Sequence, residues 1–249
     1  MAIAGFYPIF NRWSDEGTLH IYSDPHFGDK ELEGGIFNRP SAEEQVKMIN
    51  AKVGRKDTII ILGDVGDVEY VRQIRAKRKV LIMGNHDAGR SNYERQTFTK
   101  FYDTEYYNKG MAYYAMAGLY PGWRITVEQV YDLHSPFISW KVTADNMLFD
   151  EVYEGPLMIA EKLLLSHEPI DVPWAYNIHG HNHSGAHFTP GHMNVCSDVI
   201  GYTPINMNQW MKQGHMSKVQ SIHRETINEA TARSKKRKAK NRSAASRRF

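Results

Sequence analysis

Aspartate, asparagine and histidine side chains gather in five short polar clusters along the chain. In chain order, the clusters contain Asp24, His26, Asp64, Asn85, His86, His167, His181 and His183. Taken singly, each cluster is as easily a structural turn or a hydrogen-bonded histidine as a functional site. Together they supply the oxygen and nitrogen ligands that hold divalent cations. Two such cations, about 3.5–4 Å apart, can clamp a phosphate and activate a water, so the set predicts hydrolysis of a phosphate ester.

The residue types in the clusters suit a pair of cations. Two cations at short range repel, and an aspartate carboxylate can bridge them with its two oxygens. Neutral imidazoles and an asparagine oxygen can fill the remaining positions without adding excess negative charge. The only cysteine is Cys196, so neither a thiolate metal site nor a disulfide framework is available. This ligand set suits Mn, Fe or Zn rather than Ca, and does not distinguish among the three.

Each cluster directly follows a short apolar run that is typical of a buried strand. The runs are 18–23, 58–62, 79–83, 162–165 and 176–178. Helical patterns lie elsewhere, at 41–53 (with a capping box of Ser41 and Glu44), 69–77, 92–101 and 205–213. Strands that alternate with helices indicate an α/β fold, in which ligands bind beyond the carboxyl ends of the strands. The clusters occupy those ends.

Composition divides the chain into an acidic body, 1–228, and a basic tail, 229–249. The net charge is +3, but nine Lys or Arg residues and no acidic residue lie within 231–249, which leaves 22 basic against 28 acidic residues elsewhere. We expect the tail to be disordered. It either binds nucleic-acid phosphates or remains solvated. An aromatic-rich insertion, about 102–160, is predicted to form a cap of strands and loops in which ordinary packing, rather than base stacking, explains most of the aromatics.

Location is predicted from what the sequence lacks. It has no apolar stretch long enough to span a bilayer and no secretory signal pattern. We therefore expect a cytoplasmic protein, or a nuclear one if the host is eukaryotic.

The order of the motifs resembles the calcineurin-like metallophosphoesterases. The motifs are Asp24-x-His26, Gly63-Asp64-x-x-Asp67, Gly84-Asn85-His86-Asp87, His167 and Gly180-His181-x-His183. Further segments are similar to small bacterial and phage members of that family, namely Phe27-Gly28, Asn38-Arg39-Pro40, Asn194-Val195-Cys196 and 201–205. The resemblance implies a four-layer αββα sandwich, in which two mixed sheets pack face to face with helices outside.

The resemblance also implies a role for each residue. The first metal ion would be held by Asp24, His26 and His183, and the second by Asn85, His167 and His181. Asp64 would bridge the two ions. His86 would face the phosphate and stabilise or protonate the leaving oxygen, with Asp87 orienting its ring. Two residues keep alternative interpretations: Asp67 either orients a ligand or is structural, and Arg39 either binds a substrate phosphate or is a surface arginine in a turn.

These inferences predict a binuclear phosphoesterase in which a metal-bridging hydroxide attacks phosphorus. A phosphodiester is the favoured substrate, because His86 could protonate a poor leaving group and the basic tail suits a nucleotide or nucleic acid. The alternatives are a phosphomonoesterase, a protein phosphatase, or a non-catalytic binding protein that retains the fold.

Overall fold

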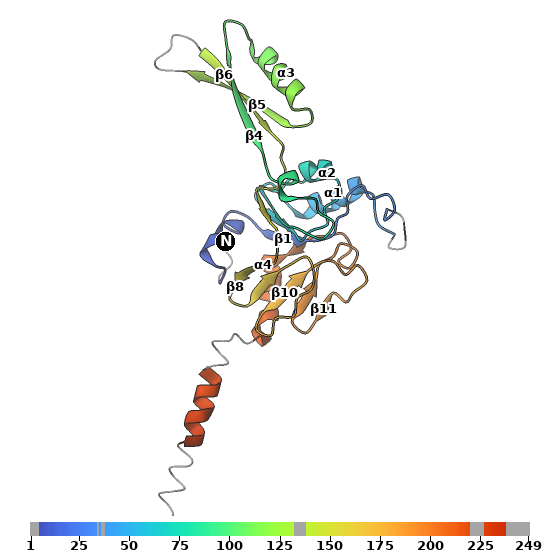
Figure 1. Ribbon diagram of the computed structural model, residues 1–249, viewed down its shortest axis with the longest axis vertical. Coiled ribbons are helices and arrows are strands. Elements are labelled where there is room, and N and C mark those ends of the chain that lie inside the picture. Colours follow the sequence, from blue (N-terminus) through green and yellow to red (C-terminus); the bar gives the residue numbers. More distant parts are fainter. Residues whose placement is uncertain (1–4, 34, 36–37, 132–137, 220–226, 238–249) are drawn as a thin grey trace, which may run out of the picture.

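The computed structural model describes residues 5–33, 35, 38–131, 138–219 and 227–237. Two five-stranded sheets form the body, and a three-stranded sheet with one helix forms an arm that projects from it (Figure 1). This mixed α/β architecture confirms the predicted fold class. Within the described ranges, none of the helices combines the length and apolar character that crossing a membrane requires.

The first sheet contains the predicted strands that precede the first three polar clusters. Its order is β13-β1-β2-β3-β7, and every neighbouring pair is parallel except β13 with β1. Its strands are β1 (Leu19–Tyr22), β2 (Thr58–Ile61), β3 (Arg78–Ile82), β7 (Glu151–Tyr153) and β13 (Ile205–Asn206). Because β1, β2 and β3 run in parallel, the residues that follow them lie at one edge of the sheet.

The second sheet contains the strands that precede the histidine clusters. Its order is β11-β12-β10-β9-β8, with β9, β10 and β12 parallel and an antiparallel strand at each side. Its strands are β8 (Leu157–Ala160), β9 (Leu163–Leu165), β10 (Tyr176–His179), β11 (Phe188–Thr189) and β12 (His192–Asn194). His167 and His181 therefore also follow parallel strands.

The two sheets pack face to face over one apolar core. Along β1, Leu19 and Ile21 belong to this core, whereas Tyr22 belongs to the cluster on the other side of the first sheet. The second sheet contributes side chains such as Leu165 and Ile178, both fully buried. Burial of each aliphatic side chain contributes about 1.5–3 kcal/mol. The predicted pair of packed sheets is confirmed, and this core fixes the strand ends that carry the polar clusters.

Helix α1 (Ala42–Lys52) covers the outer face of the first sheet. Its predicted capping box is confirmed, because the Ser41 hydroxyl accepts from the Glu44 backbone N–H and the Glu44 carboxylate accepts from that of Ser41. The helix buries Val46 and Ile49 in the cluster that contains the outward side chains of β1, β2 and β3. The sequence therefore placed this helix correctly.

The other two helices of the body are shorter than predicted. Helix α2 (Val68–Gln73) ends well before the predicted end of 69–77, because Ile74 takes an extended backbone that leads into β3. Helix α4 (Met207–Lys212) begins after β13, and its cap Asn206 accepts from the backbone N–H of Gln209. The described residues also include three short 3-10 helices: η1 (Pro8–Trp13), η2 (Arg90–Asn92) and η3 (His215–Lys218).

The arm has its own sheet and its own small core. Its elements are β4 (Thr97–Asp103), α3 (Lys109–Leu119), β5 (Arg124–Tyr131) and β6 (Ile138–Asp145). The sheet is antiparallel with β6 in the centre, and one face packs against α3 through Tyr102, Ala112, Met116, Val142 and Ala144. Figure 1 shows the arm extending away from both body sheets.

Two predictions about the arm are wrong. The sequence predicts a helix over 92–101, but the structure has strand β4 from Thr97, where threonine and phenylalanine favour extended backbone. No helix was expected where α3 lies. Apart from Lys109 at its first position, its exposed side chains are uncharged and include Met111, Tyr114 and Leu119, so the usual amphipathic signal is absent.

The insertion and the tail also differ from the sequence-based outline. The arm spans 97–145, and the rest of the predicted cap, up to residue 160, provides β7 and β8 to the two body sheets. In the tail, 227–237 is helical and exposed, with an ion pair between Arg233 and Glu229 one turn apart. The sequence predicts disorder there, but its Ala, Lys and Arg content favours helix. Residues 238–249 lie outside the described part.

Candidate metal centre

The five polar clusters meet at one place, beyond the carboxyl ends of the parallel strands of both sheets. Glycines make this approach possible. A Cβ atom on Gly63 would clash with the backbone of Gly84, and one on Gly180 would overlap the Ser23 hydroxyl and the Asp24 carboxylate. The absence of these side chains lets loops from different strands carry their ligands into contact.

One group of side chains consists of Asp24, His26 and His183. Their ligand atoms all lie within 4.8 Å of one another, and His183 Nε2 is 3.7 Å from Asp24 Oδ1. Asp24 Oδ1 and His26 Nε2 are buried and make no hydrogen bond to the described residues. Buried polar atoms without a partner are costly, and a shared cation would satisfy both of these.

A second group consists of Asn85, His167 and His181. Asn85 Oδ1 lies 2.8 Å from His167 Nε2 and 3.2 Å from His181 Nδ1, and these two nitrogens are 3.2 Å apart. His167 Nδ1 donates to the carbonyl of Leu62 at 2.8 Å, which leaves Nε2 of a neutral ring as an acceptor. Two acceptors, Asn85 Oδ1 and His167 Nε2, thus face each other, an arrangement that a cation stabilises.

Asp64 lies between the two groups. Its Oδ2 is 3.5 Å from His26 Nε2 of the first group and 3.4 Å from His167 Nε2 of the second. Its Oδ1 accepts from the backbone N–H of His86 at 3.0 Å, and its side chain is only 2% exposed. This carboxylate is therefore placed to contact ions held by either group.

The spacing of these atoms fits divalent cations. Ligands about 2.1 Å from one ion lie roughly 3.0–3.4 Å apart at tetrahedral or octahedral angles, and most of the separations above fall near this range. Burial raises the pKa of Asp24 and lowers that of His26 to about 4. Both shifts disfavour the charged form of the side chain, because both groups are desolvated. The seven predicted ligands therefore fit the metals that the resemblance implies.

Asp198, which the sequence analysis did not select, contacts the ring nitrogen of His183 that does not face Asp24. Its Oδ2 is 2.6 Å from His183 Nδ1 and its Oδ1 accepts from the Tyr202 hydroxyl at 2.5 Å. The hydrogen bond to Asp198 raises the pKa of His183. With Nδ1 held in this way, Nε2 is directed toward Asp24. Asp198 follows β12, a strand that the sequence analysis did not predict, so no local signal pointed to this residue.

Arg39 lies inside the protein rather than on its surface. Its guanidinium donates to the carbonyls of Asp24 and Pro25 at 2.9 Å and pairs with Asp198. The side chain is fully buried. These contacts support a role in holding the loop that carries Asp24, in place of the two interpretations that the sequence left open.

Cys196 belongs to a third cluster, with His183 and Asp198, whose ligand atoms also lie within 4.8 Å of one another. Burial raises the pKa of the Cys196 thiol, which therefore stays protonated and is a poor metal ligand. The hydrogen bond between His183 and Asp198 already accounts for the geometry. This cluster is best explained as the support of the first ligand group.

Two further predicted residues, His86 and Asp87, lie beside the ligands. His86 is exposed, and its ring centre is 5.8 Å from that of His26. The Asp87 carboxylate accepts from three backbone N–H groups, those of Asp64, Val65 and Gly84, so it holds two ligand loops together. Its predicted contact with the His86 ring is not among the interactions of the described residues.

Asp67 has a structural contact of its own. Its carboxylate accepts from the backbone N–H of Glu69 and caps the start of α2. Of the two interpretations left open by the sequence, this contact supports the structural one.

Similarity to known proteins is clearest at the level of a family. A family model described as "Calcineurin-like phosphoesterase" matches residues 17–213, which include all seven predicted ligands. A solved structure of a protein of unknown function, AQ665 from Aquifex aeolicus, is 18% identical to this chain. The match covers 79% of this chain and 98% of that one, with a TM-score of 0.46. Among curated proteins, none matches.

Proposed function

This chain belongs to the calcineurin-like phosphoesterase family, whose members are metal-dependent phosphoester hydrolases, and we propose that it hydrolyses a phosphodiester with two divalent cations. The proposal rests on one observation above all. Asp64 Oδ2 lies 3.5 Å from His26 Nε2 and 3.4 Å from His167 Nε2, each a member of a different ligand group. A carboxylate in that position supports a shared bridge between two ions.

The residues have separate tasks in this proposal. Asp24, His26 and His183 would hold one ion, and Asn85, His167 and His181 the other. The ions would act as Lewis acids on the phosphoryl oxygens and would lower the pKa of a water. The hydrogen bond from His167 Nδ1 to Leu62 and that of His183 Nδ1 with Asp198 orient the rings, so that the ligand nitrogens need little reorganisation.

His86 supports the diester preference. Its imidazole is exposed beside the ligand groups, and its backbone N–H donates to Asp64, which fixes the start of the side chain. An imidazole in this position could donate a proton to a departing alkoxide oxygen. Diesters with poor leaving groups gain most from such a proton donor. The basic tail adds support for a nucleotide or nucleic acid as the substrate, because nine cations attract phosphates.

Mn, Fe and Zn remain the proposed metals. All seven ligand atoms are nitrogen or oxygen, and the nearby Cys196 thiol stays protonated because burial raises its pKa. Elemental analysis of the purified protein would identify the metal and its stoichiometry. We expect about two ions per chain.

The test compares initial rates on bis(p-nitrophenyl) phosphate and p-nitrophenyl phosphate with the identified metal. We expect faster hydrolysis of the diester. Asp64→Asn should lower the rate by more than about 100-fold and weaken metal binding, because it removes the anionic bridge. Asp67→Asn is the matched control, since Asn caps a helix as well as Asp does, and it should retain the rate within about twofold.

Each contrary result has a distinct meaning. Faster hydrolysis of the monoester would favour the phosphomonoesterase alternative. Full activity of Asp64→Asn with one bound ion would rule out the binuclear arrangement. Bound metal without hydrolysis of any phosphate ester would favour a binding protein.

A further inference from the structure

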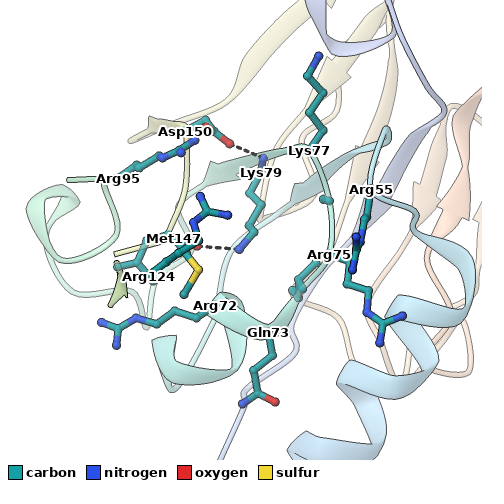
Figure 2. Close-up of a pocket in the computed structure, with 13 residues that line it drawn as sticks. Arg55, Arg72, Gln73, Arg75, Lys77, Lys79, Arg95, Arg124, Met147 and Asp150 are labelled. Carbon is teal, nitrogen blue, oxygen red and sulfur yellow. Dashed lines mark hydrogen bonds and ion pairs between the residues drawn. The ribbon is translucent and has the colours of Figure 1, made fainter. Parts of the chain in front are cut away.

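A polar cavity lies near the start of β3, at the end of the first sheet that is opposite to the metal centre. Figure 2 shows the residues that line it. Its volume is about 460 Å³, within the range of small-ligand pockets. It is lined by the end of α2, the start of β3 and the base of the arm. Seven cationic side chains line it, and we call them the basic pocket: Arg55, Arg72, Arg75, Lys77, Lys79, Arg95 and Arg124.

Positive charge in the basic pocket exceeds the negative charge around it. Asp150 is the only acidic residue among those that line it. Four of the cations have carboxylate partners: Arg95 with Asp145 and Asp150, Arg124 with Asp145, Arg72 with Glu69, and Lys77 with Glu16. Seven cations against these four carboxylates leave a formal charge of +3. Several pairs are solvent-exposed and worth about 0–1 kcal/mol each, so an incoming anion can compete with them.

Three cations retain donors for a ligand. Arg55 and Arg75 are exposed and form no ion pair with any other described residue. Arg72 Nε is buried and has no acceptor among the described residues. Each guanidinium can donate two parallel hydrogen bonds to phosphate oxygens, and Figure 2 shows Arg72 and Arg55 on different sides of the pocket.

Lys79 forms the inner wall of the pocket. Its ammonium group donates to the carbonyls of Val71 and Met147, both at 2.6 Å, and the residue is only 6% exposed. Neither partner carries a charge, and burial lowers the pKa of Lys79 to about 8. A buried cation with only carbonyl partners is costly, and a nearby anion would offset that cost. Figure 2 shows Lys79 and the surrounding arginines from separate segments.

We propose that the basic pocket is a second anion site, which binds the phosphate groups of a polyanionic ligand. None of its lining residues is aromatic, so the ligand would be held by its phosphates and not by stacking of a base. The ligand is either a nucleic-acid strand or a free polyphosphate, which share this chemistry.

The second site is separate from the catalytic one. Lys79 is the second residue of β3, and Asn85 follows the other end of that strand. Six residues at a rise of about 3.3 Å span up to about 20 Å, so one phosphate cannot contact both residues. A small ligand in the pocket would therefore be distinct from the substrate, whereas a long strand could reach both sites.

The test uses the metal-loaded full-length protein and the double variant Arg55→Glu/Arg75→Glu. The matched control is Lys109→Glu/Lys212→Glu, which makes the same change in net charge at exposed positions on the arm and α4. The probes are a fluorescent 20-nucleotide phosphorothioate single strand, measured by anisotropy, and tripolyphosphate, measured by calorimetry. Hydrolysis of bis(p-nitrophenyl) phosphate should be unchanged in both variants, which reports an intact fold and metal centre.

We expect the pocket variant to bind at least one probe about tenfold more weakly than the control variant. If the probe is the strand, losing two phosphate contacts should also reduce the slope of log K against log salt by about 1.4. Loss of strand binding alone would assign the pocket to nucleic acid, and loss of tripolyphosphate binding to a free polyphosphate. Equal binding by the two variants, or no binding of either probe by the wild type, would overturn the second site. Failure of the proposed hydrolysis would instead appear as inactive wild type.

Discussion

Replacing Asp198 by asparagine would show how far the metal centre depends on its supporting contacts. The carboxylate contacts four groups: the His183 ring at 2.6 Å, the Tyr202 hydroxyl at 2.5 Å, the Arg39 guanidinium and the Cys196 thiol at 3.7 Å. Its side chain is 2% exposed and that of Arg39 is fully buried. Asparagine keeps the shape of the side chain and removes its charge, so both metal affinity and stability should change.

The expected magnitudes follow from these contacts. A carboxylate that orients a metal-binding histidine is worth about 10–100-fold in metal affinity, or about 1.4–2.7 kcal/mol. Leaving Arg39 buried without its carboxylate costs about 3–5 kcal/mol of folding free energy. Arg39 keeps its hydrogen bonds to the carbonyls of Asp24 and Pro25, so we expect the lower end, about 3 kcal/mol. A domain with about 5–15 kcal/mol of stability would remain folded.

The assay separates the two effects. Urea unfolding of the metal-free protein gives the stability, and competition with a chelator gives the metal affinity. Tyr202→Phe is the control, because it removes one hydrogen bond to Asp198 without altering charge; its metal affinity should stay within about twofold of wild type. The double variant Arg39→Met/Asp198→Asn should recover much of the stability while metal binding stays weak, since it removes both buried charges.

One result would refute this reasoning. If Asp198→Asn, or the double variant where the single one is unstable, bound metal as tightly as wild type, His183 would not depend on Asp198. The first ligand group would then need another explanation.

Three other perturbations test separate features. His86→Gln should abolish turnover but keep the metal content, whereas loss of metal would make His86 a ligand. The pKa of Lys79 is about 8 in the folded protein and about 10.5 in the unfolded chain. Below pH 8 the side chain is charged in both states, and burying that charge lowers the free energy of unfolding. This loss of stability disappears as the pH rises from 8 to 10.5, where only the unfolded chain still binds the proton. Urea unfolding should therefore show wild type gaining up to about 3 kcal/mol relative to Lys79→Met over that interval, and a constant difference would contradict the burial argument. Metal-free His181→Gly should be more stable than His181→Ala by about 1 kcal/mol, the reverse of the usual order, because φ is +66° there; equal stabilities would show that no strain is held at this residue.

The sequence was most informative where local and tertiary signals agree. The run 59–62 is apolar at every position because the strand is buried on both faces, and a polar residue just after such a run must lie at a strand end. Asp64 and His167 were found in this way. Ser41 and Glu44 marked the start of α1 because a capping box satisfies backbone groups within one turn of the chain.

Features that depend on contacts between distant segments could not be predicted from the sequence. Asp198 acts through His183 and Arg39, and nothing in the spacing of these three residues indicates that they meet. Helix α3 packs on a sheet of the arm and leaves apolar side chains such as Tyr114 exposed, so its pattern carried no clear helical period. The charge of the basic pocket comes from four separate segments, at 55, 72–79, 95 and 124, which are brought together only by the fold.

The backbone conformation of the ligand loops restricts which residue types can occupy the ligand positions. Asp24, His26, Asp64 and His181, four of the seven predicted ligands, have positive φ of 55°, 42°, 51° and 66°. This conformation costs a residue other than glycine about 1–2 kcal/mol. Asp and His tolerate it better than most residues, so the side chains that hold metals also suit these turns.

Hydrogen bonds between neighbouring loops stabilise these positive-φ conformations. The backbone N–H of Asp24 donates to the Gly63 carbonyl, and that of His26 to the Asp64 carbonyl, while the His181 N–H donates to the Asp24 carboxylate. The ends of β1, β2 and β10 are thereby fixed together before any ion binds. The core between the sheets supports these strand ends. The free-energy cost of the positive-φ turns is therefore met when the protein folds, and the ligands need little rearrangement to bind cations.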